Sequence, residues 1–348
     1  MVNVARRLTI LACIVLVLVA VGLSAFWLYG AERLKQTVAH LEANWRAQGG
    51  ELSYENFRLD GFPMWFRIQV DKPMVGLPQA RSPWHWEGPP MRMRMSPFAP
   101  RGRALFPGKH QLNITVFGTP VTLSIEARDA EARYRGRISE ASYVVLGDTL
   151  SVSVNGQPPL TVSNVDFEIT QIRGATDHLK PSARFSFEID DVSLPAGSLP
   201  EQFRSRPIDL AKLQGHVLGP FTPDFNRAAA TAWRDLGGTV EVESLELRWG
   251  PLKLVAVGTM ALDENLQPLA ALTATITGFN ETIDALTATG AIQKSEADAT
   301  KTVLSLLAKP PPRLLGGPPE ITVPITIQNQ RLSMGPLALT VPPIEWPD

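Results

Sequence analysis

Side chains that could do chemistry are scattered along this chain rather than grouped. Its five histidines include no pair at i, i+2 or i, i+4, and its single cysteine, Cys13, lies in an apolar N-terminal segment. A metal site built on cysteine thiolates and an intrachain disulfide each need a second cysteine, so both are excluded. We therefore expect no metal ligands and no cofactor.

Sequence signatures of catalytic loops are also missing. The chain has no G-x-S-x-G elbow, no Walker loop and no G-x-G-x-x-G run, which are the common signals for acyl transfer, phosphate binding and dinucleotide binding. Asp190 and Asp191 are neighbours, but adjacent side chains on a strand point to opposite faces and would not share a proton. The sequence predicts a protein that is not an enzyme and has no catalytic residues.

One proline-rich segment, residues 78–107, gathers side chains suited to an apolar ligand. These are two tryptophans and three methionines: Trp84, Trp86, Met91, Met93 and Met95. The prolines favour an irregular or edge-like structure. Because Arg92 and Arg94 alternate with the methionines, the three methionines can form one apolar face of a strand. Methionine also adapts to irregular partners, so the same five residues are the candidate apolar ligand surface.

The N-terminus predicts a membrane anchor. No charge occurs from Leu8 to Ala31, a stretch of roughly 36 Å as a helix, which exceeds a hydrocarbon core of about 30 Å. Arg6 and Arg7 precede it, so the positive-inside rule places residues 1–7 in the cytoplasm and the rest outside. The alternative is a signal peptide cleaved near Ser24.

Composition describes a globular chain beyond this segment. A net charge of −1, with 44% hydrophobic and 19% charged residues, leaves no footprint of nucleic-acid binding. The remaining length suits one large β domain or two smaller ones.

Most of the chain alternates apolar and polar residues with a period of two. This pattern predicts antiparallel strands with one buried face. The apolar positions include Leu112, Ile114, Val116; Val121, Leu123, Ile125; Leu150, Val152, Val154; Val165, Phe167, Ile169; Phe185, Phe187, Ile189; Leu245, Leu247, Trp249; and Ile321, Val323, Ile325, Ile327.

Three segments have helical spacing instead. Leu34, Val38, Leu41 and Trp45 predict an amphipathic stalk helix over 31–48 that stops at the glycines 49–50. Residues 222–236 predict a second helix capped by a Thr-Pro-Asp sequence. Residues 279–308 predict one long or two short helices before a triple proline.

Several short motifs carry a family resemblance through their order along the chain. They are Trp45 with Gly49, the Gly61-Phe62-Pro63 turn, the strand from Gly258 to Asp263 followed by Leu266 and Pro268, and the run from Leu332 to Leu337. With them the chain resembles the bacterial family called domain of unknown function 2125 over nearly its whole length. Its layout is similar, more distantly, to AsmA-like envelope proteins implicated in lipid traffic. The resemblance implies a membrane-anchored envelope protein.

Together these patterns predict a mainly β (α+β) fold: a transmembrane anchor over 8–30, then an elongated antiparallel β domain over 49–348 with a few packed helices. A division into two subdomains is expected near 200–222. We expect a single-pass protein of the bacterial inner membrane, with its C-terminal domain in the periplasm. Its expected partners are membrane lipid, an acyl-chain ligand in an apolar β groove, and other envelope proteins. The alternative is an envelope interaction or assembly protein with a closed core and no ligand.

Overall fold

The computed structural model describes residues 2–47, 49–78, 83–116, 119–175, 177–194, 208–222, 226–288, 293–308, 319–334, 337–344 and 346. The chain divides into two compact units. Unit 1 comprises residues 1–122 and 133–136, and unit 2 comprises residues 123–132 and 137–348. The long strand β9 (Thr119–Gly136) contributes residues to both. This division lies at residues 122–137, whereas the boundary expected near 200–222 falls partly on residues outside those described.

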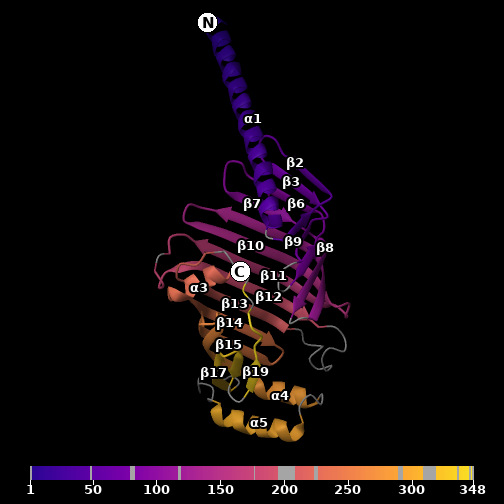
Figure 1. The fold of residues 1–348 in the computed structure, drawn as a ribbon, viewed down its shortest axis with the longest axis vertical. Helices are drawn as coiled ribbons and strands as arrows, with labels where there is room; N and C mark the ends of the chain where they lie inside the picture. The colour runs from indigo at the N-terminus through magenta and orange to yellow at the C-terminus, as the bar shows by residue number, and fades with distance from the viewer. Residues whose placement is uncertain are drawn as a thin grey trace. The chain divides into compact units, whose positions relative to one another are not determined.

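A single helix, α1 (Val2–Ala47), opens the chain (Figure 1). It continues without a break from the apolar segment into the predicted amphipathic stretch and ends just before Gly49, which has a φ of 79°. A glycine in the left-handed region is a common helix terminator. The part of α1 from Cys13 onward is long and apolar enough to cross a membrane. A signal sequence meets the same criteria of length and hydropathy.

The second half of α1, predicted as a stalk, packs along one side on the strands of unit 1. Ala31 is buried, and Leu34, Val38 and Trp45 are half-buried. The indole Nε1 of Trp45 lies 3.1 Å from the carbonyl oxygen of Glu51 at the start of the first strand. Leu41, predicted on the same stripe, is 63% exposed, because at 100° per residue it falls at the edge of the stripe.

Unit 1 holds two sets of short antiparallel strands. One set pairs in the order β2, β3, β6, β7, and the other in the order β1, β4, β5, β8. Their bounds are β1 (Glu51–Ser53), β2 (Asn56–Asp60), β3 (Phe66–Asp71), β4 (Met74–Leu77), β5 (Trp84–Glu87), β6 (Met91–Met95), β7 (Arg101–Leu105) and β8 (Gly108–Val116). The proline-rich segment 78–107 is therefore more regular than predicted, because its prolines fall between the strands β5, β6 and β7.

Unit 2 is an antiparallel meander in which each strand from β10 to β19 pairs with the next along the chain. The bounds are β10 (Glu140–Val154), β11 (Leu160–Ile172), β12 (Pro181–Ser193), β13 (Ile208–Leu218), β14 (Thr239–Trp249), β15 (Leu252–Leu262), β16 (Pro268–Thr277), β17 (Glu320–Gln328), β18 (Arg331–Met334) and β19 (Leu337–Thr340). This confirms the predicted mainly β, antiparallel fold. The one-sided alternation of apolar residues indicated it, because antiparallel sheets bury one face and leave the other in water.

Three neighbouring strands of unit 2 each carry a residue in the left-handed region. These are Thr149, Asn164 and Asp191, with φ values of 47°, 50° and 46°. The pairing of β11 with β12 shifts register on both sides of Ser163. Such a bulge sets two residues opposite one and increases the local twist. The alternation of apolar side chains therefore resumes with an offset of one residue after the bulge.

Three described helices belong to unit 2. α3 (Arg227–Asp235) begins at Asn226, whose side chain accepts a hydrogen bond from the backbone N–H of Ala229 at 2.8 Å. The predicted start at Thr222 was too early, because this asparagine supplies a strong N-cap four residues later. α4 (Phe279–Ala288) and α5 (Lys294–Leu307) are two short helices, one of the two predicted alternatives.

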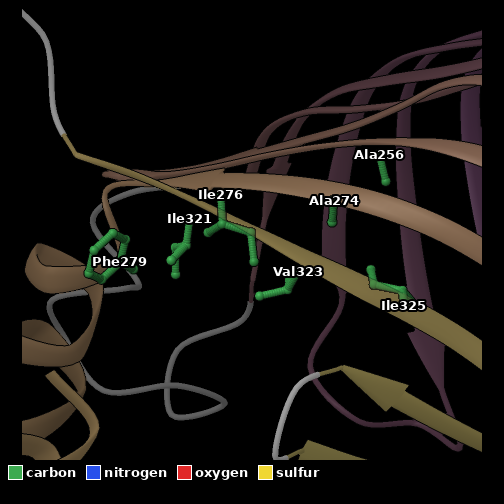
Figure 2. Packing of buried hydrophobic residues seen from close by; sticks show 7 residues of the cluster. All are labelled: Ala256, Ala274, Ile276, Phe279, Ile321, Val323 and Ile325. Carbon is green, nitrogen blue, oxygen red and sulfur yellow. The ribbon is translucent and has the colours of Figure 1, made fainter. Parts of the chain in front are cut away.

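The main core of unit 2 lies where α4 and α5 meet the sheet. α4 contacts β15 and α5 contacts β17. Figure 2 shows the buried side chains of this cluster, which come from β15, β16, β17 and the first residue of α4: Ala256, Ala274, Ile276, Phe279, Ile321, Val323 and Ile325. We call this cluster the sealed end of the sheet.

Candidate functional site

Titratable side chains do not gather into a reaction centre within the part of the chain that the structure describes. No group of three His, Cys, Asp or Glu side chains there could hold a metal ion. Asp191 occupies the bulge position on β12, and Asp263 is a turn residue whose carboxylate accepts from the backbone N–H groups of Asn265 and Gln267, both at 2.8 Å. Asp263 thus stabilises its turn, and Asp191 takes the left-handed backbone conformation of the bulge.

The five residues of the candidate apolar ligand surface lie on two strands that do not pair with each other. Trp84 and Trp86 are half-buried on β5, where the ring of Trp84 lies 6.0 Å from that of Trp45. The methionines are half-buried on β6, where Met91 and Met93 pair with Val70 and Ile68 of β3. The structure thus joins the methionines to the apolar side of β3 and one tryptophan to the end of α1.

The histidines near this segment also have local partners. Nε2 of His85 lies 3.2 Å from a carboxylate oxygen of Glu87. His110 is buried, its ring stacks on Trp86 at 5.9 Å, and its Nε2 lies 2.9 Å from the carbonyl oxygen of Phe106. Burial lowers the pKa of His110, and the hydrogen bond to Phe106 opposes this shift. A buried ring packed between aromatic neighbours suits a structural role.

A larger apolar surface emerges in unit 2 from the strand register. Side chains directly opposite each other across a sheet lie on the same face. Following the pairs from β10 to β17 gives three rows on one face. The central row is Val145, Phe167, Phe187, Leu213, Leu245, Ala256, Ala274 and Val323; one flanking row includes Val165, Ile189, Ala211, Leu247, Leu254, Ile276 and Ile321; the other includes Tyr143, Ile169, Phe185, Gly215, Val242, Gly258, Leu272 and Ile325.

We call this surface the apolar face. Its central row is most exposed at β10 and most buried at β15 to β17, whereas Val242 in a flanking row is buried already on β14. At β10, Tyr143 is 45% exposed and Val145 is 38% exposed. At the sealed end, Ala274 is 0% exposed and Val323 is 9% exposed under α4 and α5. Between them, Phe167 and Phe187 are half-buried. Among the described helices of unit 2, α4 contacts β15 and α5 contacts β17.

The sequence indicated several strands of the apolar face, but not β13 or β16 and not the face as a whole. Alternation predicts which side chains of one strand point the same way, and it does so correctly for Phe167 and Phe187. Nothing in the sequence states which residue lies opposite which. The described helices of unit 2 differ in whether they cover this face. Ile283 and Phe279 are buried on α4, whereas Trp233 of α3 packs against its own loops, with its Nε1 2.8 Å from the carbonyl oxygen of Leu218.

The comparisons with known proteins give one match. The family described as uncharacterised proteins conserved in bacteria, DUF2125, matches residues 27–343. The match begins at Trp27, the residue where α1 first buries a large side chain against unit 1. Neither a curated protein nor a solved structure matches the chain.

Proposed function

We propose that this chain, which belongs to the uncharacterised bacterial family DUF2125, is a membrane-anchored protein that binds acyl chains on the apolar face of unit 2 and catalyses no reaction. We place it in the bacterial inner membrane, crossed once by α1. Arg6 and Arg7 favour a cytoplasmic N-terminus, with the strands of both units in the periplasm.

A retained anchor is supported by the continuity of α1. The helix runs through the candidate cleavage site at residues 22–24 without a break. Its next residues are built into unit 1, because Trp27 is buried and its Nε1 donates to the carbonyl oxygen of Trp65 at 2.9 Å. A helix that is continuous with the folded unit positions that unit at the membrane.

The observation that carries lipid binding is the gradient of burial along the apolar face. A contiguous apolar surface that stays half-exposed in a folded protein marks a site for an apolar partner. At the sealed end α4 and α5 contact β15 and β17. From β10 to β14 the central row stays exposed or half-buried. An acyl chain has the shape and chemistry to cover such rows.

The width of the half-buried part of the apolar face is close to the length of an acyl chain. From β11 to β14 the face crosses three strand spacings of about 4.8 Å, or roughly 14 Å. One leaflet of a bilayer contributes half of a hydrocarbon core of about 30 Å. The rows therefore accommodate a substantial length of one acyl chain lying across the strands.

The test is photo-crosslinking of the full-length chain in native membranes. A benzophenone amino acid replaces Phe187 on the apolar face. The matched control carries it at Val257, which is 48% exposed and pairs with Thr273 on the opposite face of the sheet. After irradiation we expect a phospholipid-derived mass on the peptide containing position 187 and none on the peptide containing position 257.

Two outcomes would reject acyl-chain binding. Lipid adducts of equal yield at both positions would indicate exposure to bulk lipid without a site. A crosslink from position 187 to another protein, without lipid adducts, would support the alternative role in envelope assembly.

A further inference from the structure

The end of the lipid-facing part of α1 is fixed by its packing on unit 1. The ring centroids of Trp27 and Phe66 of β3 lie 5.7 Å apart. A Cβ added to Gly30 would lie 2.7 Å from the Phe66 ring. Residues packed this way do not face lipid, so the lipid-facing part ends near Phe26. From Leu8 to Phe26 the helix is roughly 28 Å long, close to a hydrocarbon core of about 30 Å.

Two turns of unit 1 are held at that level. Residues 61–65 join β2 to β3, and residues 96–100 join β6 to β7. The ring of Phe62 in the first turn contacts Trp27 at 5.7 Å, and Phe98 in the second stacks on Phe26 at 5.6 Å. Both turns therefore lie beside α1 where it leaves the hydrocarbon core.

The tips of these turns expose large apolar side chains. Phe62 is 55% exposed, Met64 is 52% exposed and Phe98 is 53% exposed. Phe26, on the adjoining turn of α1, is 46% exposed. Aromatic and apolar side chains at this depth are typical of residues that sit in the interface between acyl chains and headgroups.

A basic surface lies on the strands that these two turns connect. Arg67, Arg94 and Arg103 lie opposite one another across β3, β6 and β7, on the face away from the methionines. Arg67 is paired with Asp60 at 2.7 Å. The guanidinium of Arg94 lies 3.6 Å from the ring centre of Trp65, so the row reaches the first turn. The exposed residues Arg58, Arg92 and Arg101 add to the positive charge of this face.

We propose that unit 1 docks directly on the membrane that α1 crosses, with turns 61–65 and 96–100 inserted at the interface and the arginine row bound to anionic phospholipid headgroups. Guanidinium groups match phosphate geometry, and long arginine side chains reach from apolar surroundings to the headgroup level. The inference rests on α1 as the anchor of the proposed function, and it is independent of acyl-chain binding by unit 2.

The experiment uses the full-length chain in nanodiscs, with Cys13→Ser and one new cysteine carrying an environment-sensitive fluorophore. Labels at Met64 and Phe98 report the turns. A label at Leu18, which is 65% exposed on α1, reports the anchor, and a label at Asn56, about 13 Å along β2 from Asp60, is the matched control in the same unit. Nitroxide lipids quench each label according to its depth.

We expect deep quenching at position 18, shallow quenching at positions 64 and 98, and none at position 56. Quenching at position 64 should be roughly twofold or more stronger with about one third phosphatidylglycerol than with neutral lipid, and it should weaken in 1 M salt, where the Debye length is about 3 Å. The variant R67Q/R94Q/R103Q should lose the dependence on anionic lipid. Lys72→Gln, which removes an exposed charge at the far end of the β2–β3 hairpin, should keep it.

Each negative quenching result contradicts a different part of the proposal. Loss of quenching at position 18 overturns the anchor. Quenching at position 18 with none at positions 64 and 98 overturns the docking alone. Shallow quenching that is the same in anionic and neutral lipid overturns the role of the arginines. The salt dependence of quenching in the chain with its native arginines tests this role even if the triple variant misfolds.

Discussion

At the scale of single residues, the burial of His110 predicts that the stability of unit 1 depends on pH. Its ring is 8% exposed on β8 and lies between Trp86 and Phe106. Burial lowers its pKa in the folded chain, against the opposing effect of the hydrogen bond to Phe106. As the pH falls past the ordinary histidine value of about 6.5, the unfolded chain therefore takes up a proton before the folded chain does.

The resulting prediction is that stability falls as the pH drops through about 6.5, and that His110→Gln reduces this loss. The measurement is the thermal midpoint of the full-length chain in detergent at a series of pH values. His178→Gln is the control, because His178 is exposed. An unchanged pH profile in His110→Gln would assign the acid sensitivity to other groups.

A second residue-scale prediction concerns Gly30, where α1 approaches β3 closely. An added Cβ would lie 2.7 Å from the Phe66 ring, whereas one at Gly22 would meet nothing within 4 Å. Gly30→Leu should destabilise the chain by about 1–3 kcal/mol through overpacking. Gly22→Leu should be neutral or slightly stabilising, because leucine has the higher helix propensity. Equal midpoints for the two variants in thermal unfolding would contradict the packing of α1 on unit 1.

At the scale of elements, the sealed end and the open part of the apolar face should respond differently to charge. Val323→Glu places a carboxylate among the buried side chains between β16, β17 and the helices, and should cost about 3 kcal/mol or more. Phe187→Glu on the half-buried part should cost less, because water can reach the carboxylate there. Thr322→Glu, on the exposed face of β17, should stay within about 0.5 kcal/mol.

Denaturant unfolding of the full-length variants measures these differences. An equal, large loss for Phe187→Glu and Val323→Glu would show that the whole apolar face is a closed core. That result would favour the assembly role over lipid binding.

At the scale of the whole molecule, the anchor makes a prediction that needs no structure of the ligand. The full-length chain should stay in the inner membrane after salt and carbonate washing, and protease added from the periplasmic side should digest the units beyond α1. The N-terminal residue of the mature chain is the decisive measurement. A soluble form that begins near Ala25 would establish cleavage of a signal peptide instead.

The sequence by itself determined the kind of element in most places. Period-two alternation identified the strands around Phe167, Phe187 and Val323, and the apolar run from Leu8 identified a helix that forms part of α1. These signals are local, because side-chain direction follows from the backbone period of a single element. The start of α3 was misplaced for the same reason. The chain offers two capping sequences, and local pattern does not decide which one the helix uses.

The tertiary structure alone decided what these elements build together. Opposite residues such as Phe187 and Leu213 come from separate strands. The pairing of β11 with β12 also shifts register at a bulge that includes the left-handed residue Asp191. The arginine row of unit 1 likewise depends on β3 pairing with β6 rather than with its neighbour β4. Pairing between separate segments is a property of the packed chain, so the apolar face and the basic face exist only once the strands are side by side.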